Sequence, residues 1–137
     1  MRNVVGVAIF VAVALTVALA AAPDATTISI GEDQVARGAR VYASNCASCH
    51  GESLEGFGPF PALAGRVFRE RWAERPLVEL HTVVAEQMPL TAPGSLSAEQ
   101  YSDVLAFILA RNGVEAGETE LDPAAEGALD ALIAFGD

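Results

Sequence analysis

The chain has 137 residues, which is enough for one domain with a modest core. It carries 18 acidic and 8 basic residues, so its formal net charge is −10, and all the basic residues are arginine. After residue 75 there are eleven acidic residues and one arginine, Arg111. This composition argues against nucleic acid as a partner, because phosphate neutralisation needs basic side chains. An acidic face favours a partner with a basic docking surface, and solubility alone is the alternative explanation.

The first residues form an apolar leader. Arg2 is followed by an apolar run over residues 4–19 and then by alanines in the A-x-A pattern. This order predicts a secretory signal peptide over residues 1–22. The alternative is an uncleaved anchor, because residues 4–22 approach the roughly 20 apolar residues that span a membrane. Either way we expect the folded part in the periplasm or on the extracytoplasmic face of the membrane. Membrane contact is expected only if the leader is retained.

The first predicted helix covers residues 33–45. Val35, Ala39 and Tyr42 recur there at helical spacing. Acidic residues sit at its start, where the helix dipole favours negative charge. The predicted helix runs directly into a C-x-x-C-H motif at residues 46–50.

The C-x-x-C-H motif is the attachment signature of a c-type haem. The thiols of Cys46 and Cys49 would add across the two haem vinyl groups, and His50 would point its imidazole at the iron. A structural disulfide explains the pair poorly, because so short a loop adds little stability. Two alternatives remain. A zinc site would need two more ligands, with only His81 and carboxylates available. A thioredoxin-like dithiol would need an α/β pattern that the sequence lacks.

Residues 51–65 form a predicted loop that is rich in glycine and proline. A loop of this length is unusual in a compact domain, and a large ligand packed against it would organise it. A short helix is predicted over residues 66–74. A longer one follows over residues 75–87, with Pro76 suited to its first position. It ends at Met88, because a residue before proline is pushed out of the helical region.

The clearest helix prediction is residues 98–111. Ser97 is a good N-cap, and Gln100 three residues later completes a capping box. Gly113 supplies the C-terminal stop. The acidic tail is predicted to begin a further short helix at Asp122, held on the body by three apolar residues: Leu129, Leu132 and Ile133. The sequence shows no strand pattern.

Iron bound by His50 needs a second axial ligand or an open coordination position. Met88 lies 38 residues beyond His50, at a helix end and on a segment free to fold over the haem. Core filler is the plain alternative for Met88, as for most methionines. His81 is the rival ligand, although a histidine in mid-helix is usually a packed or half-exposed side chain. Histidine–methionine ligation would raise the reduction potential and suit an electron carrier.

With these features the chain resembles class I cytochromes c over roughly residues 35–113. The resemblance rests on the stretches CASCHG and MPLTAPGSLSAEQYSDVLAFIL. It implies an all-α fold in which about four to five short helices surround one covalently bound haem c. It also implies that the first helix crosses the last at close range through Gly38, with Tyr42 and Phe107 as the matching aromatic residues.

The resemblance further assigns residues around the haem. The carbonyl that accepts the Nδ1 proton of His50 is assigned to Pro61, with Pro59 as the fallback. Leu63 is expected to pack on the haem, and the Trp72 indole N–H to hydrogen-bond a propionate. Arg66 and Arg69 are candidates to pair with a propionate, and a solvated face is the favoured reading for both. The complete predicted site is the thioether residues Cys46 and Cys49, the axial ligands His50 and Met88, and the pocket residues Pro61, Leu63 and Trp72.

The resemblance is closest to a bacterial subgroup that carries M-P-x-x-x-P-G-S-L-S. Its modules occur as exported carriers and fused to quinoprotein alcohol dehydrogenases, and this chain resembles the standalone form. It lacks the lysine-rich docking face of mitochondrial cytochrome c. The expected organisation is a signal peptide at residues 1–22, a mono-haem cytochrome c domain at 23–112 and an acidic extension packed on it at 113–137.

These features together predict an electron carrier rather than an enzyme. The expected role is one-electron transfer between a periplasmic dehydrogenase or membrane complex, with a quinoprotein dehydrogenase as one candidate, and an acceptor such as a terminal oxidase. We expect a monomer or a transient complex with redox proteins, through small contacts at the haem edge. The alternative is a haem enzyme or a gas or peroxide sensor with a labile sixth ligand. A third hypothesis is a tethered subunit of a larger complex.

Overall fold

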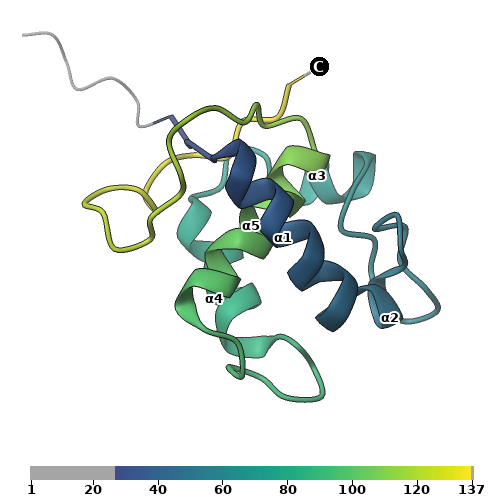
Figure 1. The fold of residues 1–137 in the computed structure, drawn as a ribbon. Coiled ribbons are helices and arrows are strands. Elements are labelled where there is room, and N and C mark those ends of the chain that lie inside the picture. The colour runs from purple at the N-terminus through teal and green to yellow at the C-terminus, as the bar shows by residue number, and fades with distance from the viewer. Residues whose placement is uncertain (1–26, 137) are drawn as a thin grey trace, which may run out of the picture.

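A computed structural model describes residues 27–136 (Figure 1). The predicted leader at residues 1–22 lies outside the described residues and stays a prediction. Within them no strand forms, and the isolated bridges are three single pairs. The all-α prediction is therefore confirmed. None of the described helices is both long and apolar enough to cross a bilayer. The described helices are α1 Glu32–Asn45, α2 Ala47–His50, α3 Arg66–Trp72, α4 Leu77–Gln87 and α5 Ala98–Arg111.

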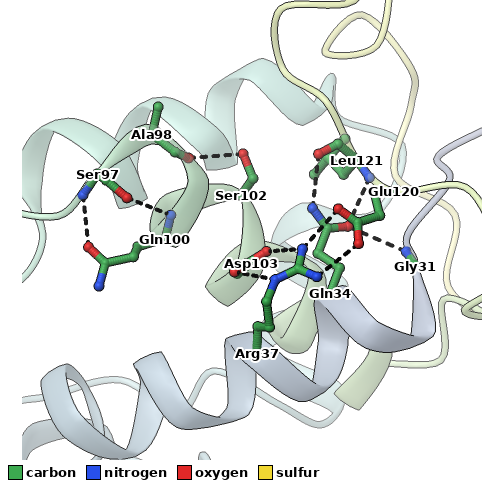
Figure 2. Close-up of polar contacts among 10 residues, drawn as sticks. All are labelled: Gly31, Gln34, Arg37, Ser97, Ala98, Gln100, Ser102, Asp103, Glu120 and Leu121. Carbon is green, nitrogen blue, oxygen red and sulfur yellow. Dashed lines mark hydrogen bonds and ion pairs between the residues drawn. The ribbon is translucent and has the colours of Figure 1, made fainter.

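Helix α5 has the predicted bounds because its ends are encoded locally. The Ser97 hydroxyl accepts from the Gln100 backbone N–H at 3.1 Å, and the Gln100 side-chain oxygen accepts from the Ser97 N–H at 2.9 Å (Figure 2). These bonds satisfy amide groups that have no partner inside the helix. Helix α5 also supplies much of the core, through Val104, Leu105, Ile108 and Leu109.

The short helix α2 was not predicted as a separate element. The backbone breaks from α-helical geometry at Cys46, with φ −124° and ψ −35°, and then resumes one further turn. The His50 N–H donates to the Cys46 carbonyl at 2.9 Å, and the Gly51 N–H to the Ala47 carbonyl at 2.9 Å. The C-x-x-C-H motif therefore occupies a rigid helical turn.

Helices α1 and α5 cross at close range, as expected (Figure 1). A Cβ atom placed on Gly38 would overlap the backbone carbonyl of Asp103 and would lie 2.8 Å from the Phe107 Cβ. The rings of Tyr42 and Phe107 pack with their centres 5.3 Å apart. Glycine is needed at this position because two helix backbones touch there.

The acidic tail does not form the predicted helix. Residues 123–130 form turns, and an isolated bridge then pairs Leu132 with Pro76. The prediction of a helix from Asp122 was wrong, although Ile133 is buried as expected.

The tail is not helical, because its carbonyls pair with the start of α4. The N–H groups of Leu77 and Val78 donate to the carbonyls of Ala131 and Leu129, at 2.9 and 2.8 Å. Those amides have no partner inside α4. A helical tail would use its carbonyls internally, so the pairing favours a non-helical backbone. Pro76 accordingly precedes α4 in an extended conformation, one residue before the position predicted for it.

The chain beyond α5 also turns back over the start of α1 (Figure 1). Figure 2 shows the polar contacts that hold it there. The Gln34 side chain donates to the Leu121 carbonyl at 2.9 Å and accepts from the Leu121 N–H at 2.8 Å. Arg37 lies between two carboxylates, at 2.9 Å from Asp103 and 2.8 Å from Glu120. These contacts join α1, α5 and the tail.

The ion pair of Glu120 predicts an acid-dependent contribution to stability. Hydrogen bonding to Arg37 lowers the pKa of Glu120 below its unfolded value. The contribution is therefore complete above an unfolded pKa of about 4.3 and is lost as the pH falls through the folded pKa. Between pH 6 and pH 3 the melting temperature should fall less steeply for Glu120→Gln than for the parent. Added salt should shrink this difference between the two proteins. Parallel pH profiles would contradict the prediction.

Candidate haem site

A cavity of about 620 Å³ lies between α2, the loop over residues 51–65, α3, α4 and the segment after α4. Its volume falls within the range of about 300–1,000 Å³ that is typical of cofactor sites. The walls are mainly apolar and come from several helices, with Phe68, Leu80, Val84, Val104 and Ile108 among them.

The cavity brings the predicted haem residues together although they lie up to 42 positions apart in the chain. They come from α2, from the following loop, from α3 and from the end of α4. Its lining includes Cys46, Cys49, His50, Pro59, Pro61, Leu63, Trp72 and Met88.

His50 is held in one orientation by the backbone. It is 7% exposed, and its Nδ1 atom lies 2.8 Å from the Pro61 carbonyl oxygen. A carbonyl can only accept, so Nδ1 carries the proton and donates it. In the neutral imidazole this tautomer has its lone pair on Nε2, as a metal ligand requires. The predicted hydrogen bond from His50 Nδ1 is therefore present, and its acceptor is Pro61 rather than the fallback Pro59.

The two cysteines line the cavity and are not bonded to each other. Burial raises the pKa of the Cys46 thiol to about 11. A thiol of this kind is poorly suited to redox exchange, which needs the thiolate. Within residues 27–136, no cluster of three or more histidine, cysteine or carboxylate side chains could hold a metal ion. The dithiol and zinc alternatives thus gain no support from the geometry.

Met88 directly follows α4, where the backbone is extended. Met88 is among the residues that line the cavity, and its carbonyl accepts a hydrogen bond of 2.7 Å from the Tyr101 hydroxyl. This bond ties the segment to α5. Tyr101 belongs to the helix predicted over residues 98–111, and nothing in that prediction indicated a polar contact to Met88.

His81, the rival ligand, lies elsewhere on α4 and is not among the described residues that line the cavity. It is partly buried, and burial lowers the pKa of its imidazole. The structure thus presents Met88, and not His81, to the cavity that His50 faces.

The arginine beside the cavity is Arg71, and neither of the two predicted candidates, Arg66 and Arg69, lies in the described lining. Arg71 lines the cavity, and its guanidinium lies 5.5 Å from the centre of the Trp72 indole. Arg66 pairs with Glu70 on the outer face of α3, at 2.7 Å. Arg69 lies outside the described lining and reaches the Gly136 carbonyl at 3.4 Å. The spacing of four arginines in ten residues did not reveal which one faces the cavity.

The donor set and the walls fit a haem. Cys46, Cys49, His50 and Met88 line one apolar cavity, and the Pro61 carbonyl accepts from Nδ1 of the histidine. An all-α fold with these groups around a C-x-x-C-H turn defines a class I c-type cytochrome.

The comparisons with known proteins agree with this class. Residues 33–108, more than half of the chain, match the family described as cytochrome c oxidase, cbb3-type, subunit III. The chain belongs to this family, which implies a covalently bound haem c. Comparison with the curated proteins finds no match.

A solved structure is also similar. A chain of the sulfane dehydrogenase SoxCD from Paracoccus pantotrophus superposes with a TM-score of 0.51 at 29% sequence identity. The match covers 74% of this chain and 60% of that chain. The present chain therefore corresponds to a part of the SoxCD chain, and the similarity supports electron transfer as the general role of the domain.

Proposed function

We propose that this protein is an exported mono-haem electron carrier with histidine–methionine ligation. One observation carries the proposal: His50 and Met88 line the same apolar cavity, together with Cys46 and Cys49. In this assignment the two cysteines hold the haem through thioether bonds, and the other two residues are the axial ligands. The haem, when bound, supplies an iron centre that gains and loses one electron.

The protein side chains set the properties of that centre. The Pro61 carbonyl fixes the tautomer and the orientation of His50. Its hydrogen bond also makes the imidazole a more basic ligand for the iron. The Tyr101 hydroxyl anchors the backbone of Met88. The apolar walls exclude water, which disfavours the more highly charged ferric state and raises the potential. A haem iron bound by both His50 and Met88 would have no position left for a substrate, so the proposed role is a carrier rather than an enzyme.

Two findings support redox proteins as partners. The family description names a subunit of a cytochrome c oxidase, and the similar structure is named a dehydrogenase. We propose transfer from a periplasmic dehydrogenase, such as a quinoprotein enzyme, or from a membrane complex, to an acceptor such as a terminal oxidase. The acidic half of the chain after residue 75 favours a basic docking surface on one partner. Such contacts are small and transient, which fits a monomer.

The test is the spectroscopy of the purified full chain. We expect one haem per chain, with the pyridine haemochrome of a haem held by two thioether bonds. The untreated ferrous protein should not bind carbon monoxide rapidly, because Met88 fills the sixth position. Rapid and tight binding would overturn the carrier proposal in favour of a haem enzyme or sensor. The N-terminal sequence of the purified protein separately distinguishes an exported, cleaved carrier from a tethered subunit.

A further inference from the structure

Asn112 is a buried polar residue at the end of α5, with 3% of its surface exposed. Its side-chain nitrogen donates to the carbonyls of Leu63 and Ile108, at 2.9 and 2.8 Å. Its side-chain oxygen accepts from the Gly65 N–H at 3.1 Å. The amide thus joins the end of α5 to the segment that leads into α3.

The segment fixed by Asn112 is continuous with the carbonyl that holds His50. Leu63 is only two residues beyond Pro61, whose oxygen accepts from His50 Nδ1. The Leu63 N–H also donates to the Leu54 carbonyl at 2.9 Å. Both backbone groups of Leu63 are therefore held, and they leave little freedom for the peptide that follows Pro61.

Pro61 also packs closely against Gly56. A Cβ atom at Gly56 would lie 2.9 Å from the Pro61 carbonyl carbon and 2.6 Å from the Ala62 nitrogen. The Gly56 N–H in turn donates to the His50 carbonyl at 2.7 Å. The Pro61 peptide is thus packed against Gly56 and is followed by a segment that Asn112 holds.

We propose that Asn112 is a positioning residue for His50, because it holds the Leu63–Gly65 backbone that keeps the Pro61 carbonyl at the Nδ1 atom. This inference rests on the proposed function, in which His50 Nε2 binds iron. Loss of the Asn112 bonds frees the peptide after Pro61, and the bond to Nδ1 weakens. With a weaker hydrogen bond, His50 donates its Nε2 lone pair less strongly to the iron. This favours ferrous iron and raises the reduction potential.

Gln34 provides a matched control for Asn112. It is also a buried amide, 2% exposed, and its side chain also makes three hydrogen bonds, to Gly31 and to both backbone groups of Leu121 (Figure 2). It lies outside the described lining of the cavity. Truncation of either amide leaves buried backbone groups unsatisfied, so both variants should lose stability to a similar degree.

The experiment compares Asn112→Ala, Gln34→Ala and the parent as full chains with haem bound. In the ferrous protein we expect hydrogen exchange of the His50 Nδ1 proton, followed by NMR, to accelerate about tenfold or more in Asn112→Ala. The reduction potential should rise in the same variant. In Gln34→Ala both readouts should match the parent although the melting temperature falls. If Asn112→Ala changes only the melting temperature, Asn112 has a structural role alone and the proposal is wrong.

A second variant and a measurement on the parent keep the test independent of how well Asn112→Ala folds. Asn112→Asp keeps an acceptor for the Gly65 N–H but turns an oxygen toward the Leu63 carbonyl, so it should behave like Asn112→Ala at His50. In the parent, the His50 Nδ1 proton and the Gly65 amide should exchange with the same dependence on denaturant, distinct from that of the Leu121 amide. Independent exchange of the His50 and Gly65 protons would overturn the proposal.

Failure of the proposed function would look different. If His50 is not an iron ligand, the parent itself lacks the spectrum of a histidine-ligated haem before any variant is made. If the parent has that spectrum and the His50 readouts do not respond to Asn112, only the positioning role fails.

Discussion

Replacement of Met88 by alanine should abolish the sulfur-to-iron charge-transfer band in the far-red spectrum of the ferric protein. Met88 and His50 line the same cavity, and the described lining contains no other methionine. Loss of this ligand should lower the reduction potential. The decrease should be a sizeable part of the range of roughly 0.8 V over which axial ligands set the potentials of haem proteins. The ferrous variant should also bind carbon monoxide rapidly. The measurements are an absorption spectrum and a redox titration.

His81→Ala is the control, since His81 is the rival ligand on the same helix. Because His81 does not belong to the described lining of the cavity, the variant should keep the band and the potential of the parent. The ligand assignment fails if the band survives in Met88→Ala or disappears in His81→Ala. The Met88 backbone remains tied to Tyr101 in either variant, so the comparison isolates the side chain.

Substitution of Gly38 by alanine should destabilise the protein by at least about 3 kcal/mol, near the upper end of the usual cost of overpacking. Alanine would normally stabilise a helix by about 0.5–1 kcal/mol relative to glycine, so helix propensity predicts the opposite sign. Overlap with the Asp103 carbonyl decides the outcome, because backbone atoms cannot rotate away as a side chain can. The measurement is urea unfolding of the haem-loaded protein, followed by the haem absorbance and by circular dichroism.

Gly117→Ala is the matched control for that substitution. Gly117 lies in the tail, and a Cβ atom placed there meets no other atom within 4 Å. The stability should therefore stay within about 0.5 kcal/mol of the parent, as for most surface changes. Equal losses in the two variants would show that the close crossing of α1 and α5 is not the cause.

Local patterns predicted the parts of the fold that neighbouring residues determine. The bounds of α5 follow from Ser97 and Gln100, which satisfy the first amides of the helix. The cysteines and the histidine of the C-x-x-C-H turn share one cavity because they are adjacent in the chain. The crossing at Gly38 was expected only through the family resemblance, since a single glycine in a helix carries little information by itself.

Other contacts depend on tertiary packing and could not be read from spacing. Arg71 faces the cavity whereas Arg66 and Arg69 do not, and the sequence does not fix how α3 is rotated about its axis. The Tyr101 hydroxyl reaches a carbonyl thirteen residues away. The tail around Leu129 has a helical pattern, yet it forms turns whose carbonyls pair with the open amides at the start of α4.

The crossing of α1 and α5 has a consequence for the order of folding. Its ion pair, Arg37 with Asp103, joins residues 66 positions apart, so the crossing closes a long loop. Every proposed haem ligand lies inside that loop, between Cys46 and Met88. The entropy lost on closing a loop grows with its length, and non-local contacts form slowly. A haem bound to both Cys46 and Met88 would shorten the free part of this loop. Attachment of the cofactor and docking of α1 against α5 therefore reinforce each other.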